Sequence, residues 1–403
     1  MASAMVLVAF LAFIPFLNRS IDPQTQRQAA ALASPAPAAA GSSAPQATAR
    51  AAVTPVPTRA GGRLTLTAGG TVAVETNVRR SGYYSAAKKY DFDEVFSLLR
   101  SDLQADLTLV TLENLVVPSA KMDRLNVPPE VLRMLRVNGI QTVALGFPGT
   151  WSKGTAAVVT TLDAAEEQGL RTLGAFAEED EADPLLSIRE INGIRVALLH
   201  YTMTPSNESR KALKKDGRTL VYPLTEQAPD EIARVREAGA QLVVVSVHWG
   251  KSGVTKLTQA QRTLAQQMAD AGADIILGSG SRCVQTAEWL TGQRKDGSSA
   301  RVLCAWGLGC LLSDSDKAAN TAGMLLHIEA AVDEEGVLTL GEPGYTATYL
   351  WHFKLDSADR YRVIRATGDG PDGMTSAEER KRTQAAQRVA ETLAGSALQL
   401  RED

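Results

Sequence analysis

Residues 241–250, QLVVVSVHWG, are the stretch from which the rest of the chain can be interpreted. Residues 242–245 and 247 are apolar and nearly all β-branched, which is typical of a strand buried in a parallel sheet. The run ends at His248-Trp249-Gly250. Because open α/β sheets bind ligands beyond the carboxyl ends of their strands, His248 is a candidate functional residue. The alternative is a histidine that only ends the strand.

The segments around this strand alternate between helix and strand patterns. Residues 258–274 have the apolar spacing of an amphipathic helix, and a short apolar strand follows and ends at Gly278-Ser279-Gly280. Upstream, apolar runs predict strands at 64–67, 107–112 and 141–145, and helical spacing predicts helices at 92–99, 128–138, 154–168 and 229–238. Residues 188–201, with Asn192-Gly193 at their centre, predict a hairpin on a type I′ turn. After Gly280 only strand patterns follow up to residue 353, so the order predicts a two-sheet α/β sandwich.

The motifs in this order resemble a known family. A strand, His248-Trp249-Gly250, a helix carrying Gln261, the sequence Ala-Gly-Ala-Asp at 271–274 and a strand ending in glycine are similar to the bacterial capsule-synthesis CapA family. The similarity can be followed over residues 64–365. It implies a calcineurin-like metallophosphoesterase fold, in which two mixed β-sheets form an α/β sandwich flanked by helices, and it implies a role in poly-γ-glutamate export.

The resemblance also implies where metal ligands would lie. Metallophosphoesterases hold two metal ions with Asp, Asn and His side chains on loops at strand ends, and the ions bind phosphate and generate hydroxide. In this chain the spacing of these loops is kept, but most ligand positions carry other residues, namely Gly70, Gly149, Gly280 and Arg282. Of the family pattern, Glu113 and His248 remain.

Two remaining ligands are too few for a tightly bound ion. A catalytic zinc site uses three protein ligands and a water molecule. His200, at the end of the predicted hairpin, is a third candidate, although a single histidine at a strand end is more often structural. His327 and His352 lie within late strands and are expected to pack or to lie at the surface. We therefore expect no tightly bound cofactor, with a weakly held divalent metal as the alternative.

Arg282 suggests a replacement for the missing metal charge. A guanidinium pairs well with a carboxylate, so we predict an ion pair between Arg282 and Glu113 across the site. The alternative is that Arg282 points to solvent. A basic pocket could bind a phosphate or a glutamate carboxylate, and Ser279 and Ser281 are further anion-binding candidates. Neither serine lies in the Gly-x-Ser-x-Gly motif of a nucleophile elbow.

The composition divides the chain into four parts. Residues 1–17 include an apolar run at 4–17 that is shorter than the roughly 20 residues of a bilayer-spanning helix, and no Lys or Arg precedes it. We interpret residues 1–17 as a hydrophobic anchor or signal segment, and residues 18–62, rich in Ala and Pro, as a disordered linker. Residues 63–366 are the predicted sandwich domain, and residues 367–403 a charged helical tail.

The overall composition does not indicate nucleic acid or zinc as a binding partner. The net charge of −3 and the absence of an evident Lys/Arg cluster give no indication of nucleic-acid binding. Three cysteines without CxxC spacing indicate neither a disulfide framework nor a zinc site. The expected location is the extracytoplasmic face of the cell membrane, with capsule-synthase membrane subunits or an anionic polymer as partners.

Two functions remain open at this stage. The favoured one is a membrane-tethered, non-catalytic binding or assembly factor in the biosynthesis of a capsule, poly-γ-glutamate or another envelope polymer. The other is a phosphoesterase-like hydrolase or a γ-glutamyl transferase. It would use Glu113 and His248 as acid and base, with or without one weakly held metal.

Overall fold

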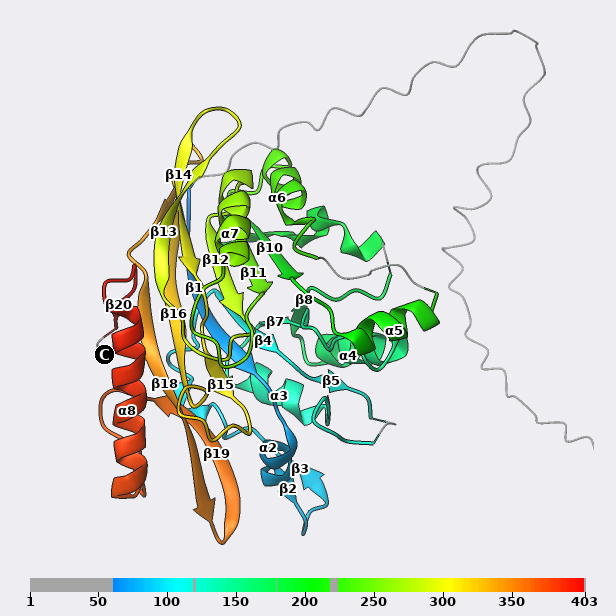
Figure 1. The fold of residues 1–403 in the computed structure, drawn as a ribbon, viewed down its shortest axis with the longest axis vertical. Helices are drawn as coiled ribbons and strands as arrows, with labels where there is room; N and C mark the ends of the chain where they lie inside the picture. The colour runs from blue at the N-terminus through cyan, green and yellow to red at the C-terminus, as the bar shows by residue number, and fades with distance from the viewer. Residues whose placement is uncertain (1–60, 119–120, 179, 218–223, 402–403) are drawn as a thin grey trace, which may run out of the picture. The chain divides into compact units, whose positions relative to one another are not determined.

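The computed structural model describes residues 61–401 apart from 119–120, 179 and 218–223. Two mixed β-sheets pack face to face, and helices cover their outer sides (Figure 1). The predicted α/β sandwich of two mixed sheets flanked by helices is therefore confirmed. The expected anchor at 1–17 and nearly all of the expected linker at 18–62 lie outside the described residues. Among the described helices, none has the length and hydrophobicity that crossing a bilayer requires.

The larger sheet has the strand order β19-β18-β16-β1-β4-β7-β8. Its parallel half consists of β1 (Gly62–Val72), β4 (Leu107–Leu112), β7 (Thr142–Ala144) and β8 (Arg171–Leu173). Its antiparallel half consists of β16 (Ala322–Val332), β18 (Gly344–Leu355) and β19 (Ala358–Arg365). Three short strands pair at its margins, namely β15 (Cys310–Leu312), β17 (Leu338–Leu340) and β20 (Gln399–Leu400).

The smaller sheet has the order β13-β14-β12-β11-β10-β9. Its four central strands run parallel and are β14 (Ser299–Ala305), β12 (Ile275–Ser279), β11 (Leu242–His248) and β10 (Ile194–Thr202). The antiparallel edge strands are β13 (Ala287–Gln293) and β9 (Ile188–Ile191). Asn192 and Gly193 between β9 and β10 have φ angles of 48° and 82°, as the predicted type I′ turn requires. The stretch 242–248 is fully buried, because the core lies on both of its faces.

Three hydrophobic layers hold this sandwich together. The middle layer lies between the sheets and joins residues of β1 and β4 with residues of β10, β11 and β12. The outer side of the larger sheet is covered by α3 (Glu130–Val137) and α4 (Thr155–Glu167). The outer side of the smaller sheet is covered by α6 (Ala228–Glu237) and α7 (Gln259–Ala271). The remaining short elements are α2 (Thr76–Ser81), α5 (Asn207–Lys215), β2 (Tyr83–Tyr84), β3 (Lys89–Tyr90), β5 (Leu115–Val116) and β6 (Asn126–Val127).

Two local predictions need correction. The predicted helix at 92–99 is a series of turns that ends in a 3-10 turn, Ser97–Leu99. The Asp91 side chain accepts a hydrogen bond from the Asp93 amide, and Phe92, Phe96 and Leu99 are still buried, so turns satisfy the same apolar spacing. The first strand is also longer than 64–67 and continues through Gly69 and Gly70 to Val72.

The C-terminal helix α8 (Ser376–Leu393) is docked on the larger sheet beside β18 (Figure 1). Ala385, Val389 and Leu393 join the middle hydrophobic layer. Arg382 is only 4% exposed and donates to the carbonyl oxygens of Ala366, Thr367 and Gly368, at 3.0, 3.0 and 2.7 Å. Arg382 also pairs with Glu379 on the same helix. The tail is therefore fastened to the sheet both by apolar packing and by one buried guanidinium.

We predict that Arg382→Met lowers the free energy of unfolding by about 2–4 kcal/mol, because three carbonyl groups lose a charged donor. Urea denaturation followed by circular dichroism measures this change in the free energy of unfolding. Arg380→Met is the matched control, since Arg380 is exposed on the same helix, and it should change stability by less than about 0.5 kcal/mol. Equal effects of the two substitutions would contradict the assigned role of Arg382.

Candidate functional site

The candidate site is a cavity of about 420 Å³ where loops from both sheets converge. The larger sheet contributes Glu75 after β1, Glu113 after β4 and the loop 147–149 after β7. The smaller sheet contributes His248 at the end of β11 and Gly280 and Arg282 after β12. The structure therefore brings Glu113, His248 and Arg282 together at the carboxyl ends of the parallel strands, where α/β sheets bind their ligands.

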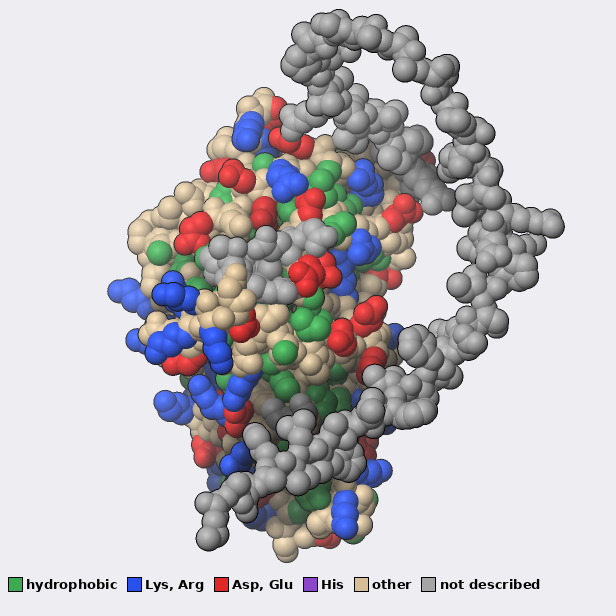
Figure 2. Space-filling view, turned by 90° about the vertical axis from the view of Figure 1, so that its right-hand side faces the viewer, with side chains coloured by type: hydrophobic (Ala, Val, Ile, Leu, Met, Phe, Trp, Pro, Cys, Tyr) green, Lys and Arg blue, Asp and Glu red, His purple; other side chains and the backbone are tan. Residues whose placement is uncertain are grey.

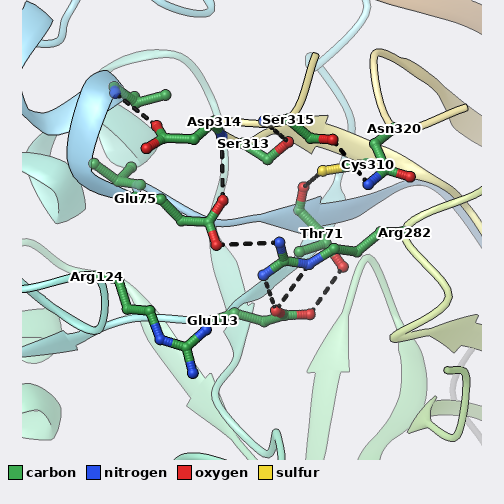
Figure 3. Close-up of polar contacts among 12 residues, drawn as sticks. Thr71, Glu75, Glu113, Arg124, Arg282, Cys310, Ser313, Asp314, Ser315 and Asn320 are labelled. Carbon is green, nitrogen blue, oxygen red and sulfur yellow. Dashed lines mark hydrogen bonds and ion pairs between the residues drawn. The ribbon is translucent and has the colours of Figure 1, made fainter. Parts of the chain in front are cut away.

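Glu113 is the centre of the polar contacts in this cavity (Figure 3). Its Oε2 accepts hydrogen bonds from Nε and Nη2 of Arg282, at 3.2 and 2.5 Å. Its Oε1 lies 3.3 Å from Nε2 of His248 and accepts a hydrogen bond from Oγ1 of Thr71, also at 3.3 Å. Nη1 of Arg282 makes a second ion pair with Oε1 of Glu75, at 3.3 Å. The predicted ion pair between Arg282 and Glu113 is confirmed.

The charges around Glu113 fix its protonation state. Burial by itself raises the pKa of Glu113, but the hydrogen bond with His248 and the charge of Arg282 outweigh burial and lower the pKa to about 2. Burial also acts to lower the pKa of Arg282, but the charge of Glu113 holds it above its ordinary value. Both groups are therefore charged at neutral pH, and Glu113 is a poor proton donor there.

The loop after β12 directs Arg282 toward Glu113. Gly280 and Arg282 have φ angles of 91° and 54°, and the second value is uncommon for a side chain other than glycine. A left-handed backbone at Arg282 costs roughly 1–2 kcal/mol, which the buried ion pairs with Glu113 and Glu75 offset. A Cβ on Gly280 would lie 2.6 Å from Cε1 of His248, so this glycine lets the loop pass against the imidazole.

Other glycines at the former ligand positions are also closely packed. A Cβ on Gly70 would lie 2.2 Å from the carbonyl oxygen of Gly309, and a Cβ on Gly149 would lie 2.7 Å from Cε2 of Phe147. Real Cβ atoms do not approach other atoms so closely. Neither position can therefore carry a metal-binding side chain unless the neighbouring groups move.

His200 is a structural residue. Its Nε2 donates to the carbonyl oxygen of Gly146 at 2.6 Å, so its Nδ1 accepts from the Ser246 hydroxyl at 2.9 Å. Burial lowers the pKa of His200 to about 4, which keeps the ring neutral. His327 lies between the hydroxyls of Thr67 and Thr346, and His352 contacts Asp359 at the surface. None of these three histidines lines the cavity.

The two candidate anion-binding serines do not reach the cavity. The Ser279 hydroxyl donates to the carbonyl oxygen of Val247 at 3.3 Å, and the Ser281 hydroxyl donates to that of Cys283 at 2.7 Å. Their exposed fractions are 4% and 1%. Ser279 belongs to β12 and Ser281 precedes the left-handed turn at Arg282, so both hydroxyls are directed into the protein. The structure thus shows both hydroxyls engaged within the protein, and anion binding by these serines stays a prediction.

The donor set does not fit a two-metal centre. Within the described part of the chain, no three His, Cys, Asp or Glu side chains are grouped so as to hold a metal ion. Both carboxylate oxygens of Glu113 are engaged by Arg282, His248 and Thr71, and a guanidinium has no lone pair to offer an ion. The geometry therefore provides a fixed positive charge in place of a metal-binding pocket.

Sequence reasoning did not single out the charged residues Glu75, Arg124 and Glu208, which line the cavity. Glu75 follows β1 at the point where the strand really ends, and a correct strand boundary would have pointed to it. Arg124 lies in the loop after β5, outside any repetitive pattern, and nothing in the sequence singles it out.

We predict that Arg282→Met lowers the free energy of unfolding by about 3–5 kcal/mol, because it leaves the Glu113 carboxylate buried without a cation. Adding Glu113→Gln to this variant should restore part of the loss, and chemical denaturation of the single and double variants measures the coupling. Arg124→Met is the control, since Arg124 is exposed and should change stability by less than about 0.5 kcal/mol. Additive single effects would show that Arg282 and Glu113 do not interact.

The lowered pKa of Glu113 also predicts a pH dependence. The unfolded chain binds this proton near the ordinary pKa of 4.5, whereas the folded protein binds it near 2. The stabilisation by ionised Glu113 is therefore complete above pH 4.5, and roughly 3 kcal/mol of it should be lost as the pH falls to 2. A plot of the free energy of unfolding against pH across this range should be flatter for Glu113→Gln than for the wild type. Parallel curves would refute the assignment.

Two solved structures are similar to the chain at low sequence identity. The chain is similar to the NAD nucleotidase of Haemophilus influenzae, with a TM-score of 0.43 and 10% identity over 85% of this chain and 58% of that one. It is also similar to a putative 5′-nucleotidase from Staphylococcus aureus in complex with α-ketoglutarate, with a TM-score of 0.41 and 10% identity over 81% of this chain and 58% of that one.

Curated relatives are capsule proteins. The chain is 26% identical to the capsule biosynthesis protein CapA of Bacillus anthracis over 250 residues, 58% of each protein. It is 28% identical to the PGA biosynthesis protein CapA of Bacillus subtilis (strain 168) over 139 residues, 34% of this chain and 36% of that protein. The matches thus span less than two thirds of these relatives. The family model described as bacterial capsule synthesis protein PGA_cap matches residues 65–315, more than half of the 403 residues. The chain therefore belongs to the family of bacterial capsule synthesis proteins.

Proposed function

We propose that this protein is a binding or assembly factor in the biosynthesis of a capsule, poly-γ-glutamate or another envelope polymer, and that it does not act as a metal-dependent phosphoesterase. The observation that carries the proposal is the engagement of Glu113 by Arg282, His248 and Thr71. A metal ion competing for this carboxylate would have to break a buried ion pair and then lie beside a fixed positive charge. We accordingly propose that no divalent metal is tightly bound.

The polymer role is supported by the family and by two relatives whose names refer to capsule or PGA biosynthesis. A cavity at the ends of the parallel strands is the expected place for a ligand. A protein in which this cavity has lost its metal ligands can still hold a ligand or a partner subunit there. Capsule-synthase membrane subunits are the partners that this role requires.

A membrane-attached position is part of the same proposal. The apolar run at 4–17 and the Ala/Pro-rich segment up to residue 62 have the composition of a hydrophobic anchor followed by a tether. Such an arrangement would hold the sandwich domain at the extracytoplasmic face of the membrane, near the machinery that produces the polymer.

A second candidate function is a hydrolase or γ-glutamyl transferase that uses Glu113 and His248. The 3.3 Å contact between the Glu113 carboxylate and Nε2 of His248 favours it, because a carboxylate that orients an imidazole is a common arrangement in acid–base catalysis. The low pKa of Glu113 restricts this residue to orienting His248 and excludes it as an acid at neutral pH.

Metal analysis and a phosphoesterase assay separate the two functions. The purified protein, loaded with manganese and then desalted, should retain less than stoichiometric metal. It should not hydrolyse bis(p-nitrophenyl) phosphate faster than its His248→Ala variant, because the wild type lacks the ligands to activate water. One tightly bound metal ion per chain, together with turnover that His248→Ala abolishes, would overturn the binding-factor proposal in favour of the enzyme.

A further inference from the structure

Arg124 is the second arginine that lines the cavity. Arg282 is occupied by Glu113 and Glu75, whereas Arg124 lines the same cavity and has no carboxylate partner among the described residues. Figure 3 shows its guanidinium near Glu113 without a hydrogen bond to the residues drawn there. An exposed guanidinium at the edge of a cavity is suited to bind a carboxylate or a phosphate.

The helix α5 extends this positive charge away from the cavity. Its first residues are attached to the loop after β7, because the Ser206 amide and the Ser209 hydroxyl both donate to the carbonyl oxygen of Pro148, at 2.8 and 2.7 Å. Ser206 and Glu208 line the cavity. From there the helix exposes four cations within two turns, namely Arg210, Lys211, Lys214 and Lys215.

We call six exposed residues the basic rim, and they are Arg124, Arg210, Lys211, Lys214, Lys215 and Lys251. Lys251 lies between Gly250 and Ser252, which both line the cavity. None of the six has an ion-pair partner in the part of the chain that the structure describes. Figure 2 faces the side of the molecule on which α5 lies, and Lys and Arg side chains gather there at mid-height.

The charge of this region is opposite to that of the whole protein. The chain has a net charge of −3. Of the nearby carboxylates, Asp123 is paired with Lys153, and Asp216 accepts hydrogen bonds from the amide and hydroxyl of Thr155. Glu208, in the first turn of α5, is the remaining one that lines the cavity beside Glu75 and Glu113. Among the described residues, six exposed cations without an ion-pair partner thus lie at the edge of the cavity and along α5.

We propose that the basic rim binds a linear polyanion, with one of its acidic groups held by Arg124 at the cavity and the following groups along α5. The nine residues of α5 extend over about 13 Å, so several charges of one chain can be met at once. A single small anion would leave most of the rim unused. This inference rests on the proposed function, since it supplies the class of ligand that the factor binds.

Fluorescence anisotropy with labelled poly-L-glutamate of defined length tests the proposal on the full-length protein. We expect binding that weakens as salt is added, and a loss of affinity of about tenfold or more in the triple variant Lys211→Gln, Lys214→Gln, Lys215→Gln. Arg124→Gln should weaken binding further. The matched control removes three exposed cations elsewhere, Lys295→Gln, Arg380→Gln and Lys381→Gln, and should bind as the wild type does.

The results of this binding experiment test the polyanion proposal independently of the proposal that no divalent metal is tightly bound. Absence of binding at low salt, or equal affinity loss in the rim and control variants, would overturn the polyanion proposal and leave the conclusion on the metal site unchanged. Labelled polyphosphate in the same assay tests whether the acidic groups that the rim binds are carboxylates or phosphates. Tighter binding of poly-L-glutamate indicates a polycarboxylate ligand, and tighter binding of polyphosphate indicates a phosphate-containing envelope polymer at the same rim.

Discussion

One buried carboxylate, Glu113, determines how the site of this protein is built. Removing a charged carboxylate from water costs several kcal/mol unless cations and hydrogen bonds surround it. Glu113 extends from the larger sheet, while Arg282 and His248 extend from the smaller sheet. The ion pair thus joins the carboxyl ends of the two sheets, in addition to the apolar packing between them. The need to satisfy this one charge fixes the loop after β12, including the left-handed backbone at Arg282.

The same contacts explain why the cavity differs from the metal centre that the resemblance implies. A metal ion and a guanidinium both neutralise a carboxylate, but only the metal can polarise a phosphate oxygen directly and activate a bound water molecule. The close packing of Gly70 on the Gly309 backbone, and of Gly280 on the His248 imidazole, shows that neighbouring atoms occupy the space in which ligand side chains would lie. The differences from the implied metal centre are therefore distributed over several loops of the site.

Charge within the cavity and charge around it have different roles. Arg282 is neutralised within the protein, so it contributes to stability and little to attraction of a ligand. Arg124 and the cations of α5 have no ion-pair partner among the described residues and lie at the surface, where cations can raise the local concentration of an anion. An internal ion pair surrounded by a basic rim is an arrangement suited to holding a charged polymer without cleaving it.

The sequence predicted most of the long strands and the hairpin turn, because hydrophobic periodicity and turn residues are local properties of the chain. The convergence of Glu113, His248 and Arg282 was implied by the resemblance to the capsule-synthesis family. The sequence did not determine where loop side chains point. The hydroxyls of Ser279 and Ser281 turn inward to backbone carbonyl oxygens, a direction that depends on the packing of the loop in the folded protein.

Only the tertiary structure decided which groups each charged side chain contacts. The segment RKALKK at 210–215 was not recognised as a basic cluster, because its meaning comes from the docking of α5 beside a cavity built from distant loops. The roles of Glu75 and Arg124 likewise depend on contacts across the two sheets. Periodicity reports which residues are buried, whereas the partner of a buried or exposed charge is set by packing between segments far apart in the chain.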